Sequence, residues 1–64
     1  MDHIYSVALI ERQAQAAADL FNSSAGKAEV VNPYDRHVEQ HAHDVWKREF
    51  DRLTAGTKAR VLVA

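Results

Sequence analysis

The sequence predicts a small all-α protein built as a helix–linker–helix hairpin. Two stretches of the 64-residue chain carry apolar residues at steps of three and four, the spacing that places side chains on one face of a helix. Between them, Asn32-Pro33-Tyr34 interrupts the pattern with residues typical of a helix boundary. These observations predict helices over residues 4–21 and 33–54 within a single domain, residues 1–64.

The first predicted helix has a broad apolar face. Its stripe consists of Val7, Ile10, Ala14, Ala17 and Phe21, widened on one flank by Leu9, Ala16 and Leu20. Asp2 is a candidate cap at the start, and residues 22–24 followed by Gly26 supply the stop. The apolar run 4–10 is also compatible with a short strand, because periodicity does not distinguish the two in short runs.

The second predicted helix has the clearer boundaries. Residues 28–31 are expected to be extended, because Pro33 disfavours helix at Asn32. Asn32 is then expected to cap a helix whose first residue is Pro33, and Gly56 to end it. The tail, residues 57–64, is expected to be a mobile end, or a strand pairing with residues 28–31. The apolar stripe of this helix consists of Val38, Ala42, Val45, Trp46, Phe50 and Leu53.

Size and charge limit the classes of function. A chain of this length buries a thin core, and the apolar surface of two helices exceeds what one seam covers. We therefore expect a homodimer with a four-helix arrangement.

Eight basic and nine acidic residues give a net charge of −1, which argues against an electrostatic nucleic-acid binder. No apolar run approaches the ~20 residues that span a bilayer, and Met1-Asp2-His3 lacks the basic start of a signal peptide, so the expected location is cytoplasmic.

Three histidines lie near the start of the second predicted helix. His37 and His41 are four residues apart and would share a helical face, with Asp44 one turn further along. Two imidazoles and a carboxylate are a metal geometry, although the set lacks a fourth ligand. The alternatives are a polar flank that contacts a partner and a cluster that titrates near pH ~6.5. A bound metal is the least favoured of these interpretations, and no cofactor is expected.

An enzyme is not expected. The chain has two glycines, Gly26 and Gly56, and therefore no glycine-rich phosphate loop. It also shows no nucleophile flanked by a plausible base, and a hairpin of this size does not enclose the ~300 Å³ pocket that small-molecule chemistry uses. The sequence instead predicts a binding protein with no small-molecule substrate.

The second helix also carries the candidate interaction residues. Trp46 is interpreted first as a core residue and second as an interface anchor, because Trp and Tyr contribute disproportionately to binding energy. The full set of interaction candidates is Tyr34, His37, His41, Val45, Trp46 and Phe50.

The region from about residue 16 to 52 resembles the ribosome modulation factor family. The resemblance rests on Ala25-Gly26-Lys27 in the linker, on Asn32-Pro33-Tyr34 and on Trp46 twelve residues after Tyr34. It implies a two-helix fold, ribosome or RNA binding, and kinship with phage-borne and resistance-associated relatives. Members of that family are strongly basic and carry Gly soon after the Trp, whereas this chain has Glu49 and a net charge of −1. The first functional hypothesis is therefore a regulator that binds a protein; the second is a ribosome- or RNA-associated factor, and the third is a histidine-based metal module.

Overall fold

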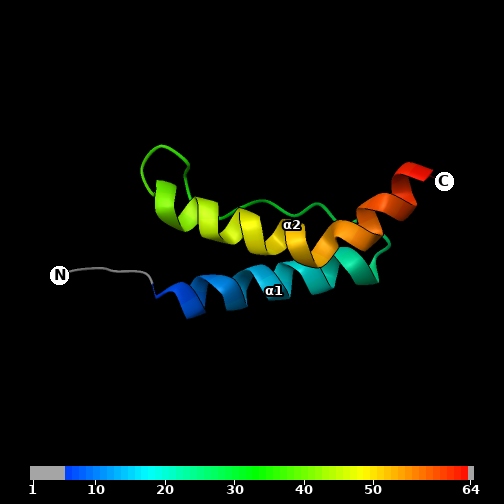
Figure 1. Ribbon diagram of the computed structural model, residues 1–64, viewed down its shortest axis with the longest axis horizontal. Coiled ribbons are helices and arrows are strands. Elements are labelled where there is room, and N and C mark those ends of the chain that lie inside the picture. Colours follow the sequence, from blue (N-terminus) through cyan, green and yellow to red (C-terminus); the bar gives the residue numbers. More distant parts are fainter. Residues whose placement is uncertain (1–5, 64) are drawn as a thin grey trace.

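The structure, a computed structural model, describes residues 6–63 and the side chains of residues 6–60. Within them are two helices, α1 (Val7–Ser23) and α2 (Gln40–Val63), which pack against each other (Figure 1). The predicted all-α helix–linker–helix fold is confirmed. The predicted start of the first helix at residues 4–5 and the cap at Asp2 lie outside the described residues.

Helix α1 has side-chain and backbone caps at its two ends. The Ser6 hydroxyl accepts the backbone N–H of Leu9 at 3.4 Å, which satisfies one of the free donors at a helix start. Residues 7–10 are helical, so the strand alternative is wrong for them. At the other end, Gly26 lies in the left-handed region at φ 82° and donates its N–H to the Phe21 carbonyl at 2.9 Å. The predicted stop at residues 22–24 followed by Gly26 is confirmed, because α1 ends at Ser23 and Gly26 forms this C-terminal cap.

Both predicted ends of the second helix are wrong. It begins at Gln40 rather than Pro33: the Asn32 side chain accepts the N–H of Tyr34, as an N-cap would, but Asp35 then forms a separate turn with the N–H groups of His37 and Val38, and the helix starts after it. It also continues through Gly56 to Val63, so residues 57–63 form neither a mobile end nor a strand. Glycine lowers helix propensity by about 1 kcal/mol, and burial of Thr54 and Thr57 on either side of Gly56 keeps this segment against α1.

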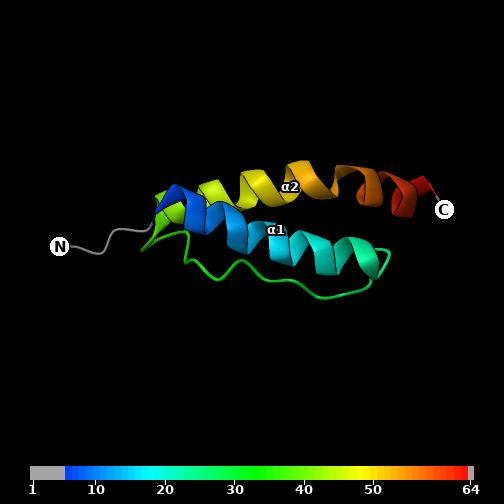
Figure 2. The same cartoon turned by 90° about the horizontal axis from the view of Figure 1, so that it is seen from below.

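The two helices run in the same direction. Contacts pair Gln15 with Glu49 near the middle and Asn22 with Leu53 and Thr57 near the end. The linker, residues 24–39, therefore returns along the whole of α1, about 25 Å at 1.5 Å per residue, before α2 begins (Figure 2). An extended chain covers about 3.3 Å per residue, so this linker is long enough to make the return.

The core lies between α1, α2 and the linker. Its largest members are aromatic: the Trp46 and Phe50 rings stack at 4.8 Å, and Phe21 meets the Phe50 ring edge-on at 5.6 Å. Val38, expected in the apolar stripe of the second helix, is 81% exposed, because it lies in the turn before α2 rather than on its inner face. The buried apolar residues are Ile10, Ala14, Ala18, Tyr34, Ala42, Val45, Trp46 and Phe50.

Candidate interaction surface

Four of the six candidate interaction residues belong to the core. Tyr34, Val45, Trp46 and Phe50 are buried within the chain itself. Their apolar surface is thereby used in folding, as the first interpretation of Trp46 predicts. The other two candidates, His37 and His41, are exposed.

The structure does not bring the predicted metal ligands together. His37 lies in the turn before α2, so the expectation that it shares a helical face with His41 and Asp44 is wrong. Within the described residues, no group of three or more His, Asp or Glu side chains is placed to hold a metal ion. His43, which was not a candidate ligand, is the histidine that approaches Asp44, with Nδ1 at 3.4 Å from the carboxylate.

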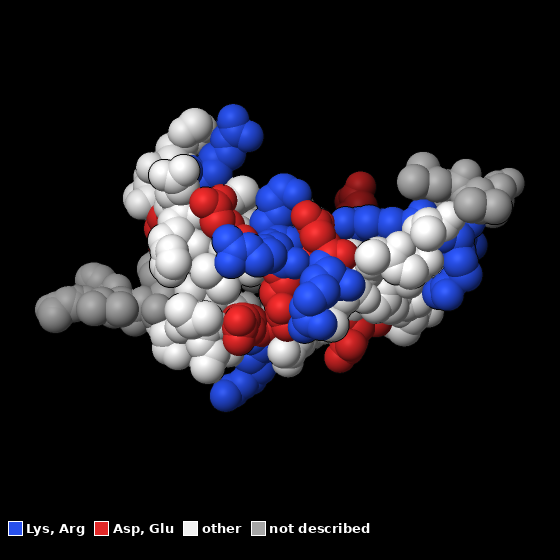
Figure 3. Space-filling model, viewed as in Figure 1, with Lys and Arg blue, Asp and Glu red and all other residues white. Residues whose placement is uncertain are grey.

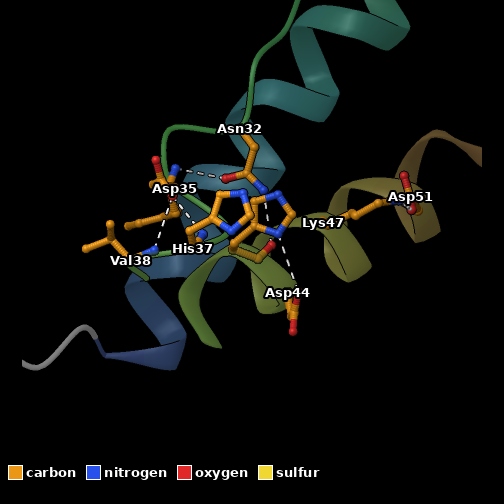
Figure 4. A network of polar contacts seen from close by, with 9 residues as sticks. Asn32, Asp35, His37, Val38, Asp44, Lys47 and Asp51 are labelled. Atoms are coloured by element: carbon orange, nitrogen blue, oxygen red, sulfur yellow. Dashed lines mark hydrogen bonds and ion pairs between the residues drawn. The ribbon is translucent and has the colours of Figure 1, made fainter. Parts of the chain in front are cut away.

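The side chains of Asn32 and Asp35 shape the turn before α2 (Figure 4). The Asn32 amide donates to the His43 carbonyl at 3.0 Å and thereby ties the linker to α2. Asp35 accepts the backbone N–H groups of His37 at 2.7 Å and Val38 at 3.1 Å. These two hydrogen bonds, supported by the charges of His43 and Arg36, lower the pKa of the Asp35 carboxyl below its usual value.

Tyr34 connects the same turn to α1, because its hydroxyl donates to the Gln13 side-chain oxygen. Asn32-Pro33-Tyr34, the motif behind the family resemblance, therefore holds the returning linker against both helices. The motif was recognisable in the sequence, but its partners Gln13 and His43 were not, because nothing local to them signals a contact with the linker.

A second polar cluster joins the far end of α1 to α2. The Asn22 amide donates to the Leu53 carbonyl at 3.0 Å, and its oxygen accepts the Thr57 hydroxyl at 2.6 Å. Thr57 is buried, so this hydrogen bond satisfies a hydroxyl that has left water. This contact was not predicted from the sequence, where Asn22 is part of a helix stop and Thr57 belongs to the tail.

Charged side chains on α2 are largely paired with one another. Asp51 accepts from Lys47 at 2.8 Å and from Lys58 at 2.9 Å. Glu49 binds Arg52 at 2.7 Å and accepts from Gln15 of α1 at 3.3 Å. Hydrogen bonds from these partners lower the pKa values of both carboxyl groups. Positive and negative side chains accordingly alternate across the middle of the face shown in Figure 3, without a continuous basic stripe.

The outer face of α1 carries an exposed apolar stripe, Leu9, Ala16 and Leu20. Leu9 is 42% and Leu20 57% exposed, although leucine side chains are usually buried. Arg12 and Asp19 lie beside this stripe, and both are exposed. Steps of three, four and seven residues place all five on one side of the helix. We refer to these five residues as the α1 outer face.

The exposure of this stripe was not predicted from the sequence. The spacing of Leu9, Ala16 and Leu20 matches that of core residues and predicted a flank of the core stripe. Their exposure follows from where α2 and the linker lie, and the sequence pattern does not specify those positions.

No protein-family model, curated protein or solved structure matches the chain. Among the described residues, neither helix is both long and apolar enough to cross a membrane.

Proposed function

We propose that the protein is a small non-enzymatic regulator that acts by binding another protein through the α1 outer face. The observation that carries this proposal is the exposure of Leu9 and Leu20 on a helix whose opposite side contributes Ile10, Ala14 and Ala18 to the core. An apolar stripe rimmed by charged residues is typical of protein interfaces, which bury apolar groups at the centre and keep polar ones at the rim.

The charge pattern favours a protein partner over RNA. Binding to a phosphate backbone relies on several unpaired Lys and Arg side chains on one face. On α2, Lys47, Lys58 and Arg52 are already paired with carboxylates of the same helix. Such a surface of mixed charge supports contacts with another protein of mixed charge.

The runner-up is the ribosome- or RNA-associated factor that the resemblance implies. Its motif residues Asn32, Tyr34 and Trp46 make contacts within the fold. The resemblance therefore supports a shared two-helix architecture more strongly than a shared ligand. A metal-dependent role has no support from the arrangement of His37, His41 and Asp44.

Affinity capture from the native host cells tests the proposal. Three tagged forms would be compared: the wild type, the α1 variant Leu9→Ser/Leu20→Ser, and the control Ala55→Ser/Ala59→Ser, which alters exposed positions of α2. We expect proteins that are captured by the wild type and the control and lost with the α1 variant, as measured by mass spectrometry. Capture that is unaffected by the α1 variant, or capture of RNA that weakens steeply with salt, would contradict the proposal.

A further inference from the structure

We propose that the α1 outer face binds a second copy of this chain, with the two α1 helices antiparallel. In this arrangement Leu9 of each copy lies against Leu20 of the other, and Arg12 lies against Asp19. The inference rests on the proposed function, because it names the partner of the same surface.

The charges on this face are complementary to themselves. Arg12 and Asp19 point to the same side, and neither makes an ion pair within the described residues. A twofold axis near the middle of the face sets Arg12 of each copy against Asp19 of the other, which gives two ion pairs by symmetry. A parallel pairing would instead set Arg12 against Arg12 and Asp19 against Asp19. Electrostatic complementarity therefore selects the antiparallel orientation.

The apolar residues fit the same orientation. The midpoint of Leu9 and Leu20 lies one residue from the midpoint of Arg12 and Asp19, so each leucine lies within about 3 Å along the helix of its counterpart in the other copy. Ala16 lies between them and is exposed, and its small side chain allows the two helix backbones to approach closely. Figure 2 shows α2 on one side of α1 and the linker on the other, which leaves a side free for a second helix.

The size of the surface predicts a weak dimer. The face of α1 is about 25 Å long and about 10 Å wide. The area that two such faces bury is well below that of stable interfaces, which is about 1,200–2,000 Å² in total. We expect a reversible dimer whose population rises with protein concentration rather than a permanent one.

Sedimentation velocity across a concentration series, from about 10 µM to about 1 mM at low salt, tests the proposal with a charge swap. Arg12→Asp alone and Asp19→Arg alone each replace two attractions with two repulsions, and we expect the dimer to weaken by about 3- to 10-fold. The double variant Arg12→Asp/Asp19→Arg restores both pairs with the signs exchanged, and we expect its affinity to return to within about 2-fold of the wild type. Circular dichroism checks that all three variants remain helical.

Two results would overturn the inference. One is a wild-type chain that stays monomeric over the whole series, and the other is a double variant no better than the singles. A monomeric wild type that still captures a protein through Leu9 and Leu20 in cells would overturn the second copy as partner but leave the proposed function standing. A dimer that responds to the charge swap, combined with capture of other proteins that does not depend on Leu9 and Leu20, would support the inference and contradict the binding of a different protein through this face.

Discussion

The two faces of α1 have similar chemistry and opposite surroundings. Ile10, Ala14 and Ala18 on the inner face are fully buried, whereas Leu9 and Leu20 on the outer face are about half exposed. Both sets repeat at helical spacing, so the difference does not arise from the helix itself. It arises because the inner face is packed between α2 and the linker, which lie on opposite sides of α1 (Figure 2), whereas the side that carries Leu9 and Leu20 is only partly covered. The inner face therefore maintains the fold, and the outer face remains exposed.

The largest effect is expected from the aromatic core that the inner face packs against. Phe50→Ala removes a ring that contacts both Trp46 and Phe21. A buried Phe→Ala substitution costs about 3–5 kcal/mol, which is most of the stability of a domain this small. Urea unfolding followed by circular dichroism measures the loss. Phe50→Leu keeps most of the volume and should cost much less. If Phe50→Ala left the free energy of unfolding unchanged, Phe50 would not be a core residue.

A smaller effect is expected at the polar contact between the end of α1 and the second half of α2. Asn22→Ala leaves the buried Thr57 hydroxyl without its acceptor and the Leu53 carbonyl without its amide donor. Loss of such a partner costs about 1–3 kcal/mol. The control is Ser23→Ala at the exposed neighbouring position, which should stay within about 0.5 kcal/mol. Equal effects of the two substitutions in the same unfolding assay would contradict the role of Asn22.

A stabilising change is expected on the outer side of α2. Gly56 lies inside the helix, and a Cβ at this position would meet no atom within 4 Å. Gly56→Ala should therefore raise the free energy of unfolding by about 0.5–1 kcal/mol, because alanine favours helix. If the helix ended at Gly56 in a left-handed conformation, alanine would be strained there and the sign would reverse. Thermal unfolding of the two proteins distinguishes these cases.

The smallest effect concerns pH at the turn before α2. The pKa of Asp35 is lowered from 3.8 by hydrogen bonds from the His37 and Val38 N–H groups. Because the folded-state pKa is below the unfolded value, the stabilising contribution is present above about pH 4 and is lost as pH falls through the folded pKa. Asp35→Asn should be less stable than the wild type near neutral pH, and the difference should shrink in acid. A difference in the free energy of unfolding between the two proteins that grows as the pH falls would contradict this prediction.

The sequence was sufficient to predict the two helices but not their ends. Apolar spacing identified the segments around Ile10 and Phe50, because burial of one face is what holds each helix in place. The ends were misassigned because Asn32-Pro33 and Gly56 act locally, and tertiary contacts outweighed them. Asn32 binds His43 rather than capping a helix, and Thr57 binds Asn22 on the far side of Gly56.

The candidate surface was harder to predict than the fold. Its residues were visible, but Leu9 and Leu20 follow the same period as buried residues. Their exposure depends on the path of the linker, which returns along α1 and sets α2 parallel to it. That path is fixed by contacts such as the hydrogen bond from Tyr34 to Gln13. These contacts join residues that are far apart in the sequence, and no local pattern in the sequence indicates them.

The most direct test of the division between the two faces compares neighbouring residues on opposite sides of α1. Ile10 is fully buried and Leu9 is 42% exposed, so Ile10→Ser and Leu9→Ser make nearly the same chemical change in different surroundings. The free energy of unfolding of each variant would be measured at low protein concentration. We predict a loss of more than about 2 kcal/mol for Ile10→Ser and a change within about 0.5 kcal/mol for Leu9→Ser. Equal losses would contradict the account, because the outer face would then be part of the core.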